Sequence, residues 1–237
     1  MYGGYYFYDS SWIVLIPAMI FTIIAQAKVR KAYSVYSDVY NSKGITGAEA
    51  ARKMMDANGL RGVAINILQG DSLNNYYNPR NRSLNLSEEV YNSRSVAAIS
   101  IACHEVGHAI QDKVSYRPLV LRNNIVPVVN ITQRFSWPLI ILGLFLSTIS
   151  PYGSLMFVIG VFCFIVVILF HLITLPVEFN ASNRALQQMD EIGILESSED
   201  YTGSKAVLNA AAMTYIAALA TAVASLLRIL IISSRRR

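Results

Sequence analysis

The stretch of residues 135–177 reads "FSWPLIILGLFLSTISPYGSLMFVIGVFCFIVVILFHLITLPV", a run of 43 residues without Asp, Glu, Lys or Arg. A helix that crosses a bilayer needs about 20 mostly apolar residues, so this run is long enough to cross twice. Pro151 and Gly153, in "PYGS", predict a turn between the two crossings. We therefore predict a transmembrane hairpin, in which "FSWPLIILGLFLSTIS" crosses the membrane and "LMFVIGVFCFIVVILFHLITL" returns.

The composition of the whole chain also favours a membrane protein. The residues AVILMFWYC make up 54% of the chain and DEKR only 15%, which is too apolar for an ordinary soluble domain. Two further segments qualify as spans, Trp12–Ala27 and Val207–Ile232. The first has no basic residues before it and has Lys28, Arg30 and Lys31 directly after it, so we predict a retained anchor and not a cleaved signal peptide.

The distribution of basic residues predicts the orientation of these spans. Of the 20 Lys and Arg residues, 14 lie between Lys28 and Arg134. Cytoplasmic loops carry such an excess, so we expect both large loops to face the cytoplasm and the protein to be a multi-pass protein of the plasma membrane. One feature disagrees, because four full crossings would put Arg235–Arg237 outside. Either the fourth helix does not cross fully, or the rule is violated there.

The loop between the first span and the hairpin has the pattern of a small α+β region. "GAEAARKMMDANGL" predicts a helix, with Thr46 as its cap and Gly59 as its stop. "VAINILQG" predicts a strand, and "LNNYYNPRNRSLNLS" predicts a strand, an Asn-Pro turn and a second strand. Ser87 is expected to start one helix, and Ser95 to cap another that runs to about Lys113.

The chemistry-bearing stretch is Cys103–Gln111, "CHEVGHAIQ". His104 and His108 are four residues apart, so on a helix they share a face and can offer imidazole nitrogens to one ion. Glu105 lies one step round the helix, where its carboxylate can take a proton from a zinc-activated water as that water attacks a peptide carbonyl. The sequence therefore predicts one catalytic zinc ion with Glu105 as general base. Cys103 is expected only to pack in the core.

A catalytic zinc needs three protein ligands and an open position, so a third ligand is required. The candidates downstream of the motif are His171, Glu178, Asp190, Glu191, Glu196, Glu199 and Asp200. His171 lies inside the predicted third span, where we interpret it as a histidine bonded within the helix bundle. Glu178 is better placed, because it lies just beyond that span and two crossings return the chain to the face of the histidines. His104, His108 and Glu178 are therefore our metal-ligand set.

These residues also resemble a known family. "HEVGHAIQ", "PVEFNASNRAL" and "SLNNYYNPRNRSLNLSEEVYNSRSVAAISIACHEVGHAIQ" are similar to the YugP-like membrane neutral zinc metallopeptidases, and the resemblance covers most of the chain. More broadly, the chain resembles gluzincins. That resemblance implies that the third ligand is the glutamate of an E-x-x-x-D pattern, which corresponds to Glu178. The aspartate of that pattern is Ser182 here, and a serine hydroxyl is a weaker acceptor for an imidazole proton.

A second departure precedes the motif. The family's usual D-H-Y-D-P stretch corresponds here to Asn74, Asn75, Tyr77, Asn78 and Pro79. Any function that the acidic and histidine positions serve in relatives is therefore altered in this chain.

Taken together, we expect a mainly α membrane protein with about four transmembrane helices and a small cytoplasmic α+β, zincin-like region that carries the motif helix. The expected segments are 1–27 (tail and first span), 28–134 (metallopeptidase region), 135–175 (hairpin), 176–206 (cytoplasmic segment with the third ligand) and 207–237 (fourth helix and basic end). The expected function is membrane-bound, zinc-dependent endopeptidase activity. The alternatives are a site-two-type intramembrane protease and a non-catalytic metal-binding scaffold.

Expectations about partners and substrate binding complete the hypothesis. The expected partners are a polypeptide substrate, with membrane proteins among the candidates, and the lipid bilayer, without nucleic acid. The oligomeric state stays open. The strand at Arg82–Leu86 is expected to be an edge strand, either one that pairs with an extended substrate or one protected by Arg80 and Arg82. Tyr116 and Arg184 are candidate donors to the oxyanion.

Overall fold

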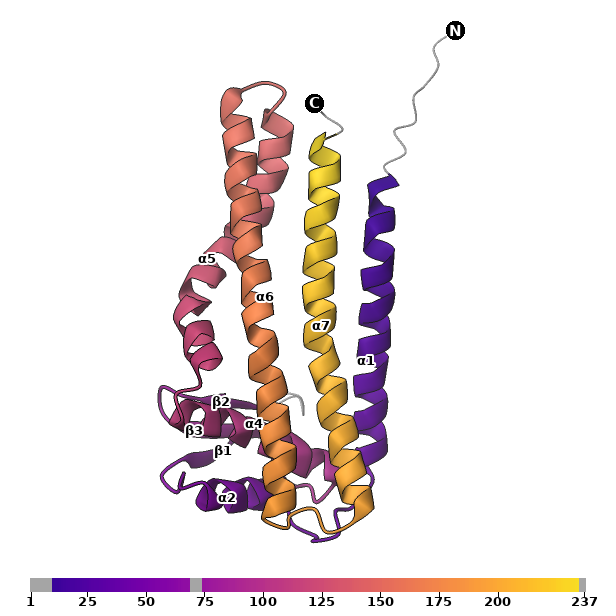
Figure 1. The fold of residues 1–237 in the computed structure, drawn as a ribbon, viewed down its shortest axis with the longest axis vertical. Helices are drawn as coiled ribbons and strands as arrows, with labels where there is room; N and C mark the ends of the chain where they lie inside the picture. The colour runs from indigo at the N-terminus through magenta and orange to yellow at the C-terminus, as the bar shows by residue number, and fades with distance from the viewer. Residues whose placement is uncertain (1–9, 69–73, 235–237) are drawn as a thin grey trace. The chain divides into compact units, whose positions relative to one another are not determined.

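The computed structural model describes residues 10–68 and 74–234 of the chain. Within these residues the protein is mainly helical, with a small three-stranded sheet (Figure 1). In chain order the elements are η1 (Ser10–Leu15), α1 (Ile16–Ser37), α2 (Gly47–Ala57), β1 (Ala64–Leu68), β2 (Tyr76–Asn78), β3 (Ser83–Ser87), α3 (Glu88–Asn92), α4 (Val96–Lys113), α5 (Arg117–Leu146), α6 (Pro151–Glu191) and α7 (Ser198–Ser234).

Four helical segments of the described chain are long and apolar enough to cross a membrane, which confirms the predicted number. They are Ser11–Ser37, Arg117–Leu146, Pro151–Glu191 and Ser198–Ser234. The helices extend well beyond the apolar stretches, because α5 begins at Arg117 and α6 continues to Glu191. Glu178 therefore lies within a continuous helix and not in a loop that follows a span. Arg235–Arg237, on which the orientation of the fourth helix depends, lie outside the described residues.

The two helices predicted for the hairpin are present and joined by a tight turn, but the turn comes earlier than expected. Pro151 is the first residue of α6, a position where proline's missing N–H and fixed φ cost little. The chain turns just before it, and Ser150 N–H donates to the carbonyl of Leu146 at 2.9 Å. A Cβ on Gly153 would lie 2.3 Å from Ser147 N, so glycine is required where the first turn of α6 meets the end of α5.

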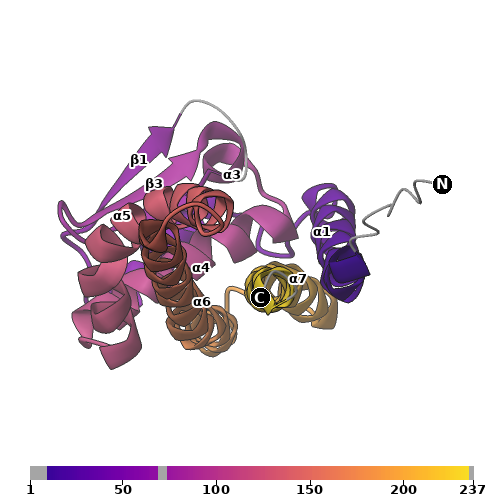
Figure 2. The same ribbon diagram turned by 90° about the horizontal axis from the view of Figure 1, so that it is seen from above.

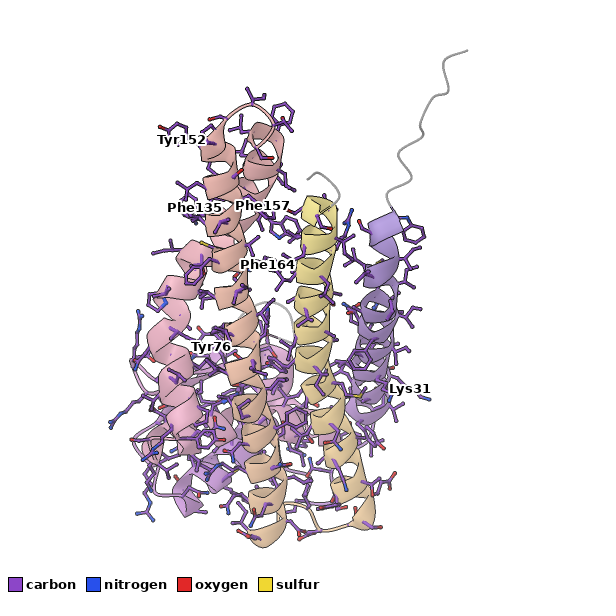
Figure 3. All side chains as sticks on the ribbon, turned by 45° about the horizontal axis from the view of Figure 1, so that its top comes forward. Lys31, Tyr76, Phe135, Tyr152, Phe157 and Phe164 are labelled. Atoms are coloured by element: carbon purple, nitrogen blue, oxygen red, sulfur yellow. The ribbon has the colours of Figure 1, made fainter. Side chains whose placement is uncertain are left out.

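The described residues form two compact units. The first, called here the helical unit, takes its residues from Met1–Ile24, Ile125–Leu172 and Ala217–Arg237. Its buried cluster is small and contains Ile140, Phe164 and Ile229. Many of its large apolar side chains are exposed, among them Phe135 of α5 and Tyr152 of α6, which Figure 3 labels. Outward-facing apolar side chains on long helices suit a lipid environment.

The second unit, called here the mixed unit, takes its residues from Ala25–Asn124 and Ile173–Ile216. It contains the sheet, α2, α3, α4 and the adjoining parts of the long helices. Its core joins distant parts of the chain, with Met54 of α2, Leu84 of β3, Ile99 of α4 and Met189 of α6 all fully buried. Cys103 is fully buried in the same core, which confirms its packing role. Burial also raises the pKa of its thiol.

Several predicted helix ends in the mixed unit are confirmed. Thr46 caps α2 in a capping box with Glu49, and Ser87 and Ser95 accept backbone N–H groups at the starts of α3 and α4. Gly59 follows α2 with a φ of +67°, a conformation that favours glycine.

The sheet corrects the prediction for the Arg82–Leu86 strand. The strand order is β1-β3-β2, with β3 parallel to β1 and antiparallel to β2. β3 is therefore the central strand, and all five of its residues are buried. The prediction of an edge strand was wrong, because the alternation in "RSLNL" does not reveal that another strand pairs along each of its two edges. With β1 on one side of it and β2 on the other, β3 has no free edge to offer a peptide.

Candidate metal centre

Helix α4 carries the two histidines on the face expected from their spacing. The rings of His104 and His108 lie edge to face, with their centroids 4.9 Å apart. Their side chains are 15% and 12% exposed. The helix is fixed at its start by the Ser95 cap and along its length by core contacts. The pair is thus held on a rigid element with limited access to solvent.

Gly107 allows α6 to reach this face. A Cβ at position 107 would lie 2.5 Å from the carbonyl oxygen of Ala181, a backbone atom that cannot move aside cheaply. The α4 and α6 backbones therefore approach as closely as glycine permits. This contact places Glu178, three residues before Ala181, beside the histidine pair.

Three potential ligand atoms converge at this point. Glu178 Oε2 lies 3.4 Å from His104 Nε2 and 3.6 Å from His108 Nε2. All three ligand atoms lie within 4.8 Å of one another. Ligands about 2.0–2.2 Å from a tetrahedral zinc are separated from each other by roughly 3.3–3.6 Å. The observed carboxylate-to-imidazole distances match that spacing.

The carboxylate oxygen is also chemically available. Glu178 Oε2 is buried and has no hydrogen-bond partner among the described residues. A buried polar atom without a partner is costly, so it marks a position where a ligand is expected. His104, His108 and Glu178 therefore fit a zinc ion and could hold one at this position.

The far side of each imidazole is held by a different residue. His104 Nδ1 lies 3.2 Å from Ser182 Oγ, and His108 Nδ1 lies 3.0 Å from Gln111 Oε1. Gln111 is fully buried and donates from Nε2 to the Val177 carbonyl at 2.8 Å and to Asn180 Oδ1 at 3.0 Å. Bonds at Nδ1 orient the rings so that both Nε2 atoms face Glu178.

The second oxygen of Glu178 is occupied by a cation. Arg122 Nη1 donates to Glu178 Oε1 at 2.9 Å, and the carboxylate side chain is only 4% exposed. A buried carboxylate needs such a partner to stay charged. Because Arg122 holds Oε1, the group presents Oε2 alone to the ligand position.

Glu105 has a different environment. It is buried, and its Oε2 accepts the Tyr77 N–H at 3.2 Å. Burial raises the pKa of this carboxyl, and the imidazoles of His104 and His108 only partly oppose that shift. For His108, burial acts to lower the pKa, but Glu178 and Glu105 outweigh it and the pKa is raised. Glu105 is not one of the three converging ligands.

Two cavities meet at this cluster. One of about 180 Å³ has a polar lining that includes Tyr77, Arg122 and Asn123. The other, of about 200 Å³, has an apolar lining that includes Ile101, Val207 and Leu208. Both are lined by the same five residues, namely Asn75, His104, Glu105, Glu178 and Tyr215. A bound molecule can therefore extend to either side of the ligand atoms.

The remaining sequence candidates lie elsewhere. In the described residues, neither His171 nor the later acidic residues join the ligand group. His171 contacts the ring of Phe170, Glu196 pairs with Lys43, and Asp200 accepts backbone N–H groups at the start of α7. Arg184 donates to Asn180 at 2.7 Å. Neither Arg184 nor Tyr116 belongs to the described lining of the two cavities.

Sequence reasoning missed four contributors to the site. Gln111 is three residues after His108 on the same helix, so helical spacing was a usable signal for it. Arg122 and Tyr215 are distant in sequence from the residues they accompany, and no local pattern marks them. Tyr77 contributes a backbone N–H, which its side chain does not reveal.

Comparisons with known proteins agree with this geometry. Residues 11–234 match the family described as "Putative neutral zinc metallopeptidase". The chain is 43% identical over 217 residues to "Putative membrane protease YugP" of Bacillus subtilis (strain 168), covering 92% of this chain and 93% of that protein. No solved structure matches the chain. This chain therefore belongs to the family described as "Putative neutral zinc metallopeptidase", and its similarity to the Bacillus subtilis protein extends along nearly its whole length.

Proposed function

We propose that this protein is a membrane-bound zinc endopeptidase in which Glu105 acts as general base. The observation that carries the proposal is the convergence of His104 Nε2, His108 Nε2 and Glu178 Oε2, with a fourth buried polar side chain, Glu105, beside them. When bound there, zinc lowers the pKa of a water toward neutrality and polarises a peptide carbonyl.

The two oxygens of Glu105 have separate tasks. Oε2 accepts the Tyr77 N–H, which fixes the plane of the carboxylate. Oε1 takes the proton of the attacking water and delivers it to the departing amide nitrogen. Tyr215 lines both cavities and offers a phenol hydroxyl to the carbonyl oxygen as that oxygen gains negative charge.

The substrate is a polypeptide that passes through both cavities. Its scissile bond lies over the five residues that the cavities share, and the chain extends into the polar cavity on one side and the apolar cavity on the other. The apolar lining on the α7 side suits an aliphatic or aromatic side chain of the substrate.

The active site faces the cytoplasm in this proposal. Support comes from the basic residues that follow the first span, Lys28, Arg30 and Lys31, because such residues are retained on the cytoplasmic side. The site-two-type alternative receives no support, since α4 is not among the four described helices that qualify as spans. The alternative of a non-catalytic scaffold is separated by the following experiment.

The test uses the purified full chain and measures zinc content beside hydrolysis of casein. We expect about one zinc per chain and an activity that a chelator removes and added zinc restores. Glu105→Gln should keep its zinc and lose about 10²–10⁴-fold in rate, since the proton acceptor is removed while the ligands stay. The same variant, purified in the same way, also controls for casein hydrolysis by a contaminating protease. A protein that holds its zinc yet cleaves neither casein nor an unfolded membrane protein would instead be a metal-binding scaffold.

A further inference from the structure

A groove remains that the proposed chemistry does not use. It lies in the mixed unit between α1 and α7, which run side by side in both views (Figures 1 and 2). α1 contributes Lys28, Lys31 and Ala32, and α7 contributes Ala206, Ala210 and Met213. The groove has a volume of about 400 Å³, within the range of about 300–1,000 Å³ typical of small-molecule sites.

Small side chains create this space. Gly203 of α7 packs against Tyr36 of α1 so closely that a Cβ would lie 2.7 Å from the tyrosine ring. This contact holds the two helices together at one end of the groove. Beyond it, Ala32, Ala206 and Ala210 leave unfilled volume between the helices. The resulting floor is apolar.

Two lysines line this apolar floor. Lys28 and Lys31 are exposed, and neither forms an ion pair with a carboxylate in the part of the chain that the structure describes. Lys28 Nζ lies 3.8 Å from Met213 Sδ across the groove. The Lys31 side chain extends outward from α1 (Figure 3). Among the described residues, the groove lining contains no acidic side chain.

The position along α1 indicates what occupies the groove. Lys28 directly follows the apolar part of a segment that qualifies as a membrane span. In the orientation proposed above, we expect both lysines at the level of the cytoplasmic lipid head groups. Basic pockets between transmembrane helices on the cytoplasmic side bind anionic head groups. Asn209, exposed at the same groove, adds an amide that can bond an ester carbonyl.

We propose that the α1–α7 groove is a binding site for an anionic phospholipid. Lys28 and Lys31 bind the phosphate, and an acyl chain lies over Ala32, Ala206 and Ala210. Positive charge selects an anionic over a zwitterionic lipid, and the apolar floor selects a lipid over a soluble phosphate.

The test titrates the full chain in detergent with palmitoyl-oleoyl phosphatidylglycerol, and bound lipid is counted by native mass spectrometry. We expect one tightly bound lipid per chain, and clearly weaker binding of the phosphatidylcholine with the same acyl chains. The double variant Lys28→Gln/Lys31→Gln should bind phosphatidylglycerol about 30-fold more weakly. Arg30→Gln/Lys205→Gln is the matched control, because it removes two exposed cations from the same helices outside the groove. It should bind as tightly as the native chain.

A second variant tests the acyl-chain position. Ala32→Leu fills the floor and keeps both lysines, so it should also weaken phosphatidylglycerol binding. Unchanged phosphatidylglycerol binding in Ala32→Leu would overturn the assignment. So would a loss of binding in Arg30→Gln/Lys205→Gln as large as that in Lys28→Gln/Lys31→Gln. So would equal affinity for phosphatidylcholine, or full competition by inorganic phosphate. Cross-linking of two chains through Val35→Cys would overturn it as well, by showing a second copy in the groove.

Discussion

Glu105 on α4 and Glu178 on α6 are both buried carboxylates, yet their surroundings differ. Glu178 has Arg122 at one oxygen and two imidazole nitrogens near the other. Glu105 has one backbone N–H, and burial raises its pKa. A carboxylate with cationic partners stays charged and suits a ligand, whereas one with few partners can gain and lose a proton. The partners of each carboxylate, and not its burial, indicate its role.

The largest expected effect is in Glu178→Gln, which removes the charge that the comparison assigns to metal binding. Two imidazoles alone hold zinc poorly, so metal content should fall and activity with it. Zinc per chain, measured by mass spectrometry after dialysis, gives the result directly. Full zinc in Glu178→Gln with loss in His171→Ala would move the third ligand to His171. Glu105→Gln is the matched carboxylate control and should keep its zinc.

Gly107→Ala tests whether the two carboxylates depend on one close contact between helices. The added Cβ would meet the Ala181 carbonyl at 2.5 Å, so α6 must shift and carry Glu178 away from the histidines. We expect weaker zinc binding and a lower unfolding temperature of the zinc-free protein. Gly62→Ala is the control, since nothing lies within 4 Å of a Cβ there. Native zinc affinity in Gly107→Ala would show that the site tolerates helix separation.

Arg122→Gln sharpens the comparison by making Glu178 more like Glu105. Without the cation at 2.9 Å, Oε1 loses its partner and the carboxylate can rotate. Loss of an outer partner of a metal ligand costs about 10–100-fold in metal affinity or activity. Competition with a zinc-binding dye would measure the affinity, and Arg122→Lys should recover part of it. Equal zinc affinity in the native chain, Arg122→Gln and Arg122→Lys would show that Arg122 does not position Glu178.

The smallest loss of zinc affinity is expected in Ser182→Ala. Gln111→Ala serves as the comparison, because Gln111 holds the other histidine. Ser182 makes one 3.2 Å contact with His104, whereas Gln111 joins His108 to the α6 backbone through several bonds. Ser182→Ala should therefore lower zinc affinity less than Gln111→Ala does. The same dye competition ranks the two variants, and the reverse order would contradict this account of ring orientation.

The sequence by itself determined the features that depend on neighbours along the chain. Four apolar segments, the capping residues Thr46, Ser87 and Ser95, and the shared face of His104 and His108 all follow from length or from helical spacing. Glu178 was also selected from the sequence, but from an expected position beyond a span. The structure places it inside α6, with its carboxylate close to both histidines.

Only the tertiary structure decided which distant groups meet. The central position of β3 depends on β1 and β2 covering both of its edges, which the alternation within the strand does not encode. The pairing of Arg122 with Glu178 joins residues 56 apart in sequence, and the approach at Gly107 depends on how α6 packs. Hydrogen bonds, ion pairs and close packing act over a few ångströms in space whatever the sequence separation. Local patterns therefore specify the elements, and packing of the core specifies the partners of each site residue.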